Sequence, residues 1–250
     1  MRVAAVQFKA REDRSLGLHE LVDAVVRAGR DRDLVVCPEM AIAGYAWEST
    51  SAVRQVAQGR EGPLGRALAE AARECGAWVV CGFPELAGDR VFNSALVIDP
   101  AGAVRFVYRK TLLFEADALW ASPGDSGYRA FDTDGGRFGV GICMDLNDDR
   151  FLAWCAQEKL DGIALPTNWV QEEGAMWDYW RWRLAQGWPE ELGVEHGDPN
   201  RARVEGVLIG ANSYGMEGAY RIRGESAVLS WRALYGAAPE SGDGVVRAAW

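Results

Sequence analysis

RFGVGICMD, residues 137–145, is the stretch of sequence that decides the fold class. Its apolar run from Phe138 to Ile142 predicts a short buried strand with Cys143 at the carboxyl end. Apolar residues at helical spacing follow from Phe151 to Lys159. A buried strand followed by a helix is typical of α/β proteins, which place their chemistry at the carboxyl ends of strands.

The same unit recurs on the amino-terminal side of this stretch. RVAAVQF (residues 2–8) predicts a strand, and the helical spacing of apolar residues from Ser15 to Arg30 predicts a helix after it. DLVVCPEM then gives a short strand from Leu34 to Cys37, and Pro38 interrupts regular pairing there. Glu39 therefore lies just past a second strand end.

Further strands are predicted from similar patterns. A helix near residues 64–75 leads to a strand at Trp78 to Phe83. FNSALVID (92–99) and VRFVYRK (104–110) are predicted to pair across a turn, with Lys110 closing the second strand. Four more strands are expected in DGIALPTNW (161–169), VEGVLIGANS (204–213), GAYRI (218–222) and ESAVLSW (225–231), with little sequence after the last one.

No repeat or linker interrupts the 250 residues, so we predict a single domain over 1–250. The one change in composition is an aromatic-rich insertion at about 171–200, which we interpret as a helix and a long connection. It contains four tryptophans, namely Trp177, Trp180, Trp182 and Trp188.

Charge and composition exclude several function classes. A net charge of -9 argues against a nucleic-acid partner, because clustered Lys and Arg drive phosphate binding. No apolar run approaches the roughly 20 residues that a membrane helix needs. The amino terminus has a strand pattern rather than that of an export signal, so we expect a cytoplasmic protein. Its five cysteines, odd in number and without CxxC spacing, are expected to be thiols.

Histidine and lysine are scarce, which limits the catalytic and metal-binding sites that the chain can form. The two histidines, His19 and His196, leave little material for a histidine-based triad or metal site. We therefore expect no metal site. Only three lysines occur, and one of them, Lys110, closes a predicted strand.

These three strand ends together supply a base, a cation and a nucleophile. A thiol with an ordinary pKa of about 8.5 is mostly neutral at pH 7, so Cys143 needs a base, and Glu39 can serve. Attack on an amide or nitrile builds negative charge, which Lys110 and a backbone N–H, expected to be that of Met144, can stabilise. Each residue also has a structural interpretation, as core cysteine or solvated strand-end charge.

Five segments, in this order and spacing, resemble the nitrilase superfamily of carbon-nitrogen hydrolases: VAAVQF, VVCPEMAIAGY, YRKTLLFEAD, GVGICMDLND and LPTNW. The resemblance implies a four-layer α-β-β-α sandwich and a catalytic triad of Glu39, Lys110 and Cys143. It also implies a thioester intermediate, no cofactor, and a homodimer formed through the helix after the nucleophile. Within the superfamily the sequence is most similar to the amidases of amino-terminal Asn or Gln.

The reaction expected from this resemblance is hydrolysis of a small-molecule carboxamide, or of the amide side chain at a peptide amino terminus, with release of ammonia. A nitrilase, an acyltransferase that uses the same thioester, and an inactive binding protein of the same fold are the alternatives.

The sequence departs from the family pattern at a second glutamate that many members carry. Counting back from the PGD-like segment places Asp117 there, and Glu115 is the nearby substitute. The shorter side chain of Asp117 reaches less far, which leaves open whether it orients Lys110 and the substrate.

Three positions beside the predicted nucleophile and at the next strand end complete the candidate site, and two neighbouring residues are interpreted as helix caps. Asp145 is predicted either to bind a substrate amine or to cap the next helix, with equal weight. Asn147 and Asp148 are interpreted as caps of that helix. Asn168 and Trp169 lie at a strand end beside the expected pocket, where Trp169 either lines the acyl site or packs in the core.

Overall fold

The first strand, β1 (Arg2–Gln7), is almost wholly buried, with a second sheet on one face and helices on the other. In the computed structural model, which describes residues 1–170, 174–185 and 203–249, Val3 and Ala5 join the core between two sheets. Ala4 and Val6 join a second core beneath two helices. Successive side chains of a strand point to opposite faces, so this apolar run fits a sheet that is covered on both sides.

In the described residues the strands form two six-stranded sheets, in the orders β14-β1-β2-β3-β4-β5 and β13-β12-β9-β8-β7-β6. Besides β1, the first sheet contains β2 (Leu34–Val36), β3 (Trp78–Ala87), β4 (Arg90–Ile98), β5 (Val104–Arg109) and β14 (Gly244–Ala249). The second contains β6 (Arg129–Thr133), β7 (Gly136–Val140), β8 (Gly162–Thr167), β9 (Val207–Asn212), β12 (Ala227–Leu229) and β13 (Leu234–Ala237). A separate hairpin is made of β10 (Tyr214–Glu217) and β11 (Tyr220–Arg223).

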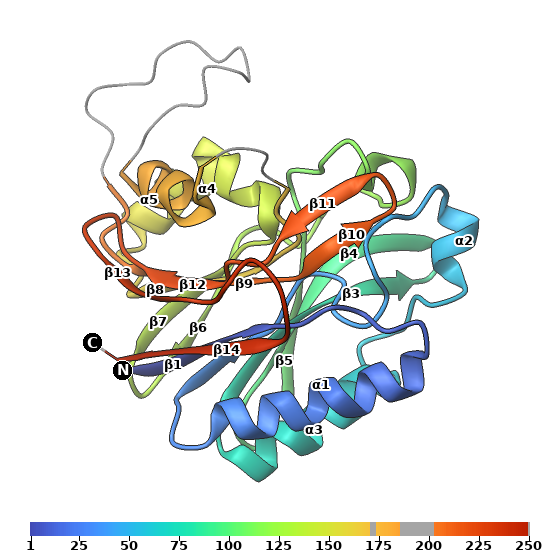
Figure 1. The fold of residues 1–250 in the computed structure, drawn as a ribbon, viewed down its shortest axis with the longest axis horizontal. Coiled ribbons are helices and arrows are strands. Elements are labelled where there is room, and N and C mark those ends of the chain that lie inside the picture. Colours follow the sequence, from blue (N-terminus) through green and yellow to red (C-terminus); the bar gives the residue numbers. More distant parts are fainter. Residues whose placement is uncertain (171–173, 186–202, 250) are drawn as a thin grey trace.

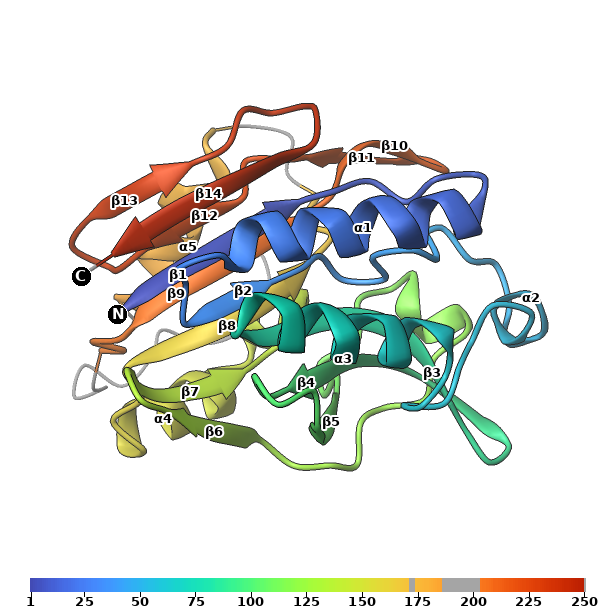
Figure 2. The same ribbon diagram turned by 90° about the horizontal axis from the view of Figure 1, so that it is seen from below.

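Helices cover both outer faces of the stacked sheets (Figure 1). They are α1 (Arg14–Gly29) and α3 (Pro63–Cys75) on the first sheet, and α4 (Asp149–Gln157) and α5 (Met176–Leu184) on the second, with α2 (Thr50–Arg54) at one end. Figure 2 shows α1 and α3 side by side across the first sheet. The four layers confirm the predicted α-β-β-α sandwich.

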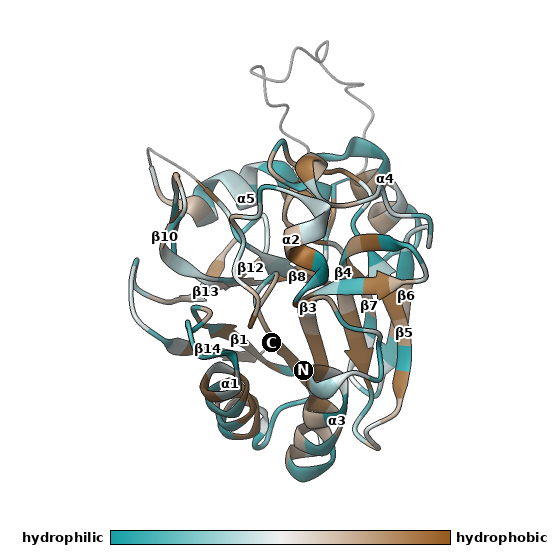
Figure 3. Ribbon diagram, turned by 90° about the vertical axis from the view of Figure 1, so that its right-hand side faces the viewer, coloured by the Kyte–Doolittle hydropathy of each residue, from teal (hydrophilic) through white to brown (hydrophobic). Residues whose placement is uncertain are grey.

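Local sequence explains where the covering helices begin and end. The side chain of Asp13 accepts the backbone N–H groups of Ser15 and Leu16, which caps α1. Pro63 opens α3, and Gly76, in the left-handed conformation at φ 68°, ends it. Figure 3 shows mostly hydrophobic strands between helices of mixed hydropathy, so each helix buries one side on a sheet.

The end of the chain differs from the prediction. The predicted strand at 225–231 is β12, but β13 and β14 follow it. β14 pairs antiparallel with β1 in the other sheet, from Arg2 opposite Ala249 to Gln7 opposite Gly244. The sequence patterns therefore did not predict β13 and β14, because short strands rich in Gly and Ala, such as GVVRAA of β14, have a weak hydrophobic signal.

The aromatic-rich insertion is described only in part. Its predicted helix is α5, in which Trp180 is buried, and Trp169 lies against it with ring centroids 5.8 Å apart. Trp188 and most of the predicted connection lie outside the described residues. None of the described helices has both the length and the apolar content needed to span a bilayer.

Candidate active site

The backbone of Glu39 is fixed where the chain leaves β2 and passes over β3. Gly82 of β3 donates its N–H to the carbonyl of Pro38 and accepts the N–H of Ala41. A Cβ at Gly82 would lie only 2.4 Å from the Cα of Glu39. Glycine is therefore required at this position in β3 to let the two backbones approach.

A fully buried charged cluster surrounds the side chain of Glu39. The Nζ atom of Lys110 lies 2.7 Å from Oε1 of Glu39 and 2.6 Å from Oδ2 of Asp117. Asn93 of β4 donates its side-chain N–H groups to both carboxylates, at 2.7 and 3.1 Å. Burying one cation with two carboxylates is costly for folding, so this cluster indicates function rather than stability.

Asn168 holds Glu39 from the second sheet. Its backbone N–H donates to Oε2 of Glu39 at 2.8 Å, and its side-chain amide donates to the carbonyl of Glu39 at 3.0 Å. Both carboxylate oxygens are thus fixed, Oε1 by Lys110 and Asn93 and Oε2 by Asn168. The structure brings Asn168 to the predicted base itself, and a role in binding substrate stays a prediction.

Cys143 begins a short 3₁₀ helix, η2 (Cys143–Asn147), shortly after β7 ends. Its φ of 45° is in the left-handed region, which a residue with a Cβ rarely adopts. Its side chain is buried, with a residue exposure of 5%. A strained backbone at a buried nucleophilic residue is a feature that active sites share.

Asp145 ties the loop that carries Cys143 to the loop that follows Lys110. Its Oδ1 accepts the N–H and hydroxyl of Thr111 and the N–H of Leu112. Its Oδ2 accepts the hydroxyl of Tyr108 and the N–H of Ile142. Asp145 does not cap α4, but its contact with the Ile142 N–H caps the start of η2. The role in binding a substrate amine does not fit, because protein donors occupy both carboxylate oxygens.

The cap of the next helix is Asp148. Its side chain accepts the backbone N–H of Arg150 at the start of α4, as predicted. Asn147 instead accepts the hydroxyl of Tyr179 and donates to the sulfur of Met144. Of the polar residues after the nucleophile, Asp145 and Asn147 therefore make hydrogen bonds inside the protein, and Asp148 caps a helix.

Comparison with known proteins decides the family. Residues 2–192 match the family model described as carbon-nitrogen hydrolase. The chain belongs to the carbon-nitrogen hydrolase family. A nitrilase of Pyrococcus abyssi is 38% identical over 138 residues, 55% of this chain and 52% of the relative. An (R)-stereoselective amidase of Pseudomonas is 32% identical over 147 residues, 58% of this chain and 52% of the relative. The aligned region thus spans about half the length of these curated relatives.

Solved structures match this carbon-nitrogen hydrolase over nearly its whole length. A mutant of the Nesterenkonia AN1 amidase, from the nitrilase superfamily, superposes with a TM-score of 0.78 at 20% identity, covering 99% of this chain and 89% of that one. A CN-hydrolase superfamily protein of Xanthomonas campestris superposes with a TM-score of 0.79 at 21% identity, covering 100% of this chain and 90% of that one. These likenesses establish the nitrilase fold for this chain.

Burial sets the protonation states in this carbon-nitrogen hydrolase. It raises the pKa of the Cys143 thiol to about 12, with the charge of Glu39 adding to the rise and that of Lys110 opposing it. Burial also raises the pKa of Glu39, where Lys110 opposes and Asp117 adds. The resting thiol is therefore neutral at pH 7, and Glu39 is a stronger base than an exposed glutamate.

Lys110 keeps its positive charge in this setting. Burial alone lowers its pKa, but the neighbouring charges of Asp117 and Glu39 outweigh that effect and raise the pKa well above the usual value. A permanently charged ammonium in a site shielded from water is suited to stabilising an anion.

The remaining predicted site residues lie in different surroundings. Asp117 reaches Lys110 despite its shorter side chain, because it begins the 3₁₀ helix η1 (Asp117–Leu119) directly beside the cluster. Glu115 is exposed and makes no hydrogen bond or ion pair within the described part of the chain, so it is not the substitute. Met144 is half-buried. Trp169 packs its ring on Tyr179, with centroids 5.5 Å apart, and a role in lining the acyl site stays a prediction.

Two residues of the site were not predicted. Asn93 lies within the apolar run of β4, where a buried amide needs hydrogen-bond partners, and that misfit was the available signal. Tyr45 is also buried, its pKa is raised by burial, and the charges of Lys110 and Glu39 act on its hydroxyl. Its ring packs edge-on against Tyr220 of the hairpin, with centroids 6.2 Å apart.

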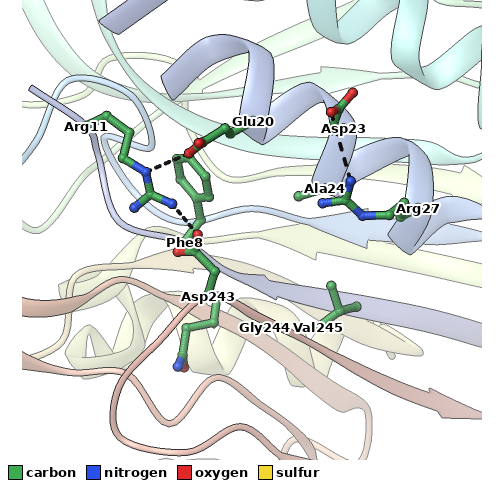
Figure 4. Close-up of a pocket in the computed structure, with 10 residues that line it drawn as sticks. Phe8, Arg11, Glu20, Asp23, Ala24, Arg27, Asp243, Gly244 and Val245 are labelled. Carbon is green, nitrogen blue, oxygen red and sulfur yellow. Dashed lines mark hydrogen bonds and ion pairs between the residues drawn. The ribbon is translucent and has the colours of Figure 1, made fainter. Parts of the chain in front are cut away.

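A surface pocket of about 390 Å³ lies elsewhere, between α1 and the start of β14 (Figure 4). Its charged side chains pair with one another: Arg11 with Glu20 and Asp243, and Arg27 with Asp23. Neither Glu39, Lys110 nor Cys143 lines it. Among the described residues no group of three His, Cys, Asp or Glu side chains is placed to hold a metal ion.

Proposed function

We propose that the protein is a thiol-dependent amidase in which Cys143 is the nucleophile, Glu39 the base and Lys110 the oxyanion-binding cation. The observation that carries the proposal is the buried Glu39–Lys110–Asp117 cluster, whose charges act directly on the Cys143 thiol. Relatives that are named as nitrilases and amidases support the same reading.

In the first half-reaction, the thiol proton of Cys143 passes to the Glu39 carboxylate as the sulfur attacks the amide carbon. The carbonyl oxygen becomes an oxyanion, which the Lys110 ammonium and the Met144 backbone N–H stabilise. Glu39 then gives its proton to the leaving nitrogen, the carbon–nitrogen bond breaks, and ammonia departs. The product on the enzyme is a thioester of Cys143.

In the second half-reaction, Glu39 takes a proton from a water molecule while the water oxygen attacks the thioester carbon. Collapse of the second tetrahedral intermediate releases the carboxylic acid, and the proton on Glu39 returns to the sulfur of Cys143. Acid and base roles alternate on one carboxylate, and its raised pKa suits both directions of proton transfer.

The substrate we propose is a carboxamide, either a small molecule or the side chain at a peptide amino terminus. Protein N-terminal amidases of two yeasts are 25% and 26% identical to parts of this chain, which keeps the peptide substrate as the second candidate. An inactive binding protein is not favoured, because a purely structural role does not need a buried cluster of this charge.

Ammonia release from a substrate panel tests the proposal. The panel contains propionamide, dipeptides with amino-terminal Asn or Gln, a carbamoyl amino acid and a nitrile. We expect release from at least one amide by the wild type and by Cys75→Ala, a control at a half-buried thiol outside the cluster, and no release by Cys143→Ala. Equal release by wild type and Cys143→Ala, or none from any compound, would contradict it.

We also propose a homodimer formed through α4, the helix after the nucleophile. α4 lies on the outer surface of the second sheet, where a second copy can reach it (Figure 1). Light scattering during size-exclusion chromatography should then give twice the 27.4 kDa of one chain. The mass of a single chain at micromolar concentration would refute this assembly.

A further inference from the structure

Thr167, the last residue of β8, has a buried hydroxyl group without a use in the fold. The residue is 0% exposed, and its Oγ1 has no hydrogen-bond partner in the described part of the chain. Burying an unpartnered hydroxyl is unfavourable, and valine has almost the same shape without that penalty. The rest of β8 is apolar, so the hydroxyl requires an explanation other than packing.

The pairing of β7 and β8 places this hydroxyl beside the nucleophile. The two strands are parallel, with Phe138 opposite Gly162 and Val140 opposite Ala164, and the pairing continues at Gly141, whose N–H donates to the carbonyl of Ala164. Extending this register by three residues sets Cys143 opposite Thr167, and η2, which begins at Cys143, packs against β8. The hydroxyl is near enough to act on the thiolate: a hydrogen bond from Thr167 favours the ionised sulfur and lowers the pKa of Cys143, against the effect of burial, although the resting geometry does not complete that bond.

The next residue along the chain already serves the base. Asn168 donates its N–H to Oε2 of Glu39 at 2.8 Å. The end of β8 therefore serves both partners of the proposed proton transfer. Thr167 lies at the proton donor, Cys143, and Asn168 lies at the proton acceptor, Glu39.

We propose that Thr167 is a positioning residue for the nucleophile, whose hydroxyl donates a hydrogen bond to the sulfur of Cys143 when the thiol proton has passed to Glu39. The inference rests on the proposed function. No bond to Thr167 forms or breaks: the proton moves from sulfur to the Glu39 carboxylate, and the Thr167 O–H turns toward the thiolate.

This role explains why the hydroxyl has no partner in the resting structure. A neutral thiol is a weak hydrogen-bond acceptor, whereas a thiolate is a charged one. The hydrogen bond is therefore strong only after deprotonation, so it lowers the barrier to attack without stabilising the resting state.

Thr167→Val and Thr167→Ser test the proposal. We expect Thr167→Val to lower kcat for ammonia release about tenfold with unchanged KM, as for loss of a hydrogen bond to a charged group. Alkylation of Cys143 by iodoacetamide, quantified by mass spectrometry of its peptide, should slow by a similar factor. Thr167→Ser should restore most of both rates. The melting temperature of Thr167→Val should equal or exceed that of the wild type, because no hydrogen bond of the resting fold is lost.

Two results would overturn the inference. The first is a Thr167→Val enzyme with wild-type kcat and alkylation. The second is loss of activity together with a lower melting temperature and no rescue by serine, which would make Thr167 a packing residue. Both leave the amidase proposal intact as long as Cys143→Ala is inactive. Absence of ammonia release by the wild type, with Cys143 no more reactive than Cys75, would instead refute the proposed function and this inference with it.

Discussion

At the scale of single residues, the charge balance around Lys110 sets the strength of the base. The negative charge of Asp117 contributes to the raised pKa of Glu39, so Asp117→Asn should lower that pKa. Because the ionised form of Glu39 is the active base, the acid limb of kcat/KM should move to lower pH, while the weaker base lowers kcat up to about tenfold. A pH profile of ammonia release measures both effects.

The matched control for this prediction is Asp125→Asn. Asp125 is also a carboxylate paired with cations, Arg90 and Arg109, but it is 45% exposed and lies outside the cluster. Its substitution should leave the acid limb where it is. An acid limb that moves equally in both variants would mean that Asp117 has no special effect on Glu39.

Glu39→Gln separates the acidity of the thiol from catalysis. The charge of Glu39 contributes to the high pKa of Cys143, so its removal should lower that pKa and speed alkylation at alkaline pH. Turnover should nevertheless fall by about 10² to 10⁴, because no base remains to accept the thiol proton during attack. Ammonia release and iodoacetamide alkylation across pH 7 to about 10 distinguish the two effects. Slower alkylation together with retained turnover would contradict the assignment of Glu39 as base.

At the scale of elements, one carboxylate joins β5, η2 and the loop between Lys110 and η1. Asp145 accepts five hydrogen bonds through its two oxygens. Asp145→Asn has only one acceptor oxygen and turns an amide donor toward other donors, so it should lower the free energy of unfolding by about 3 kcal/mol. It should also lower kcat, since the loop of Cys143 loses its attachment.

Urea denaturation and kcat of Asp145→Asn should be compared with those of Asp148→Asn. Asp148 caps α4 from the same segment, and asparagine is an equally good cap, so that variant should lose under about 1 kcal/mol and keep its kcat. If Asp145→Asn is as stable and active as Asp148→Asn, the hydrogen bonds to Asp145 are not what positions the nucleophile.

Local patterns predicted the elements that carry the chemistry, because apolar runs ending in Glu39, Lys110 and Cys143 are visible within a few residues of sequence. They did not predict the partners of Asp145 in β5 and in the loop after it, which lie 33 to 37 residues away along the chain. They also missed β14, whose place beside β1 depends on tertiary pairing rather than on its own weak pattern. Long-range hydrogen bonds leave no local periodicity to detect.

At the scale of the whole molecule, Gln7 connects the two sheets. Its side chain lies at the end of β1, fully buried, and donates to the carbonyls of Pro239 and Gly242 while accepting the N–H of Ser226, next to β12. Gln7→Ala removes all three bonds and should lower the free energy of unfolding by about 3 kcal/mol. The urea midpoint should fall with an unchanged m-value. Gln55→Ala, at an exposed position at the end of α2, is the control and should leave the midpoint unchanged.

The pairing of β1 with β14 has a consequence for the newly made chain. β1 leaves the ribosome well before β14, because Gln7 finds its partner only at Gly244. At about 5 to 20 residues per second, synthesis of the intervening chain takes on the order of ten to fifty seconds. During that time one edge of an apolar strand stays open to pairing with other nascent chains. Slower initiation, which spaces these chains apart, should therefore raise the yield of folded protein.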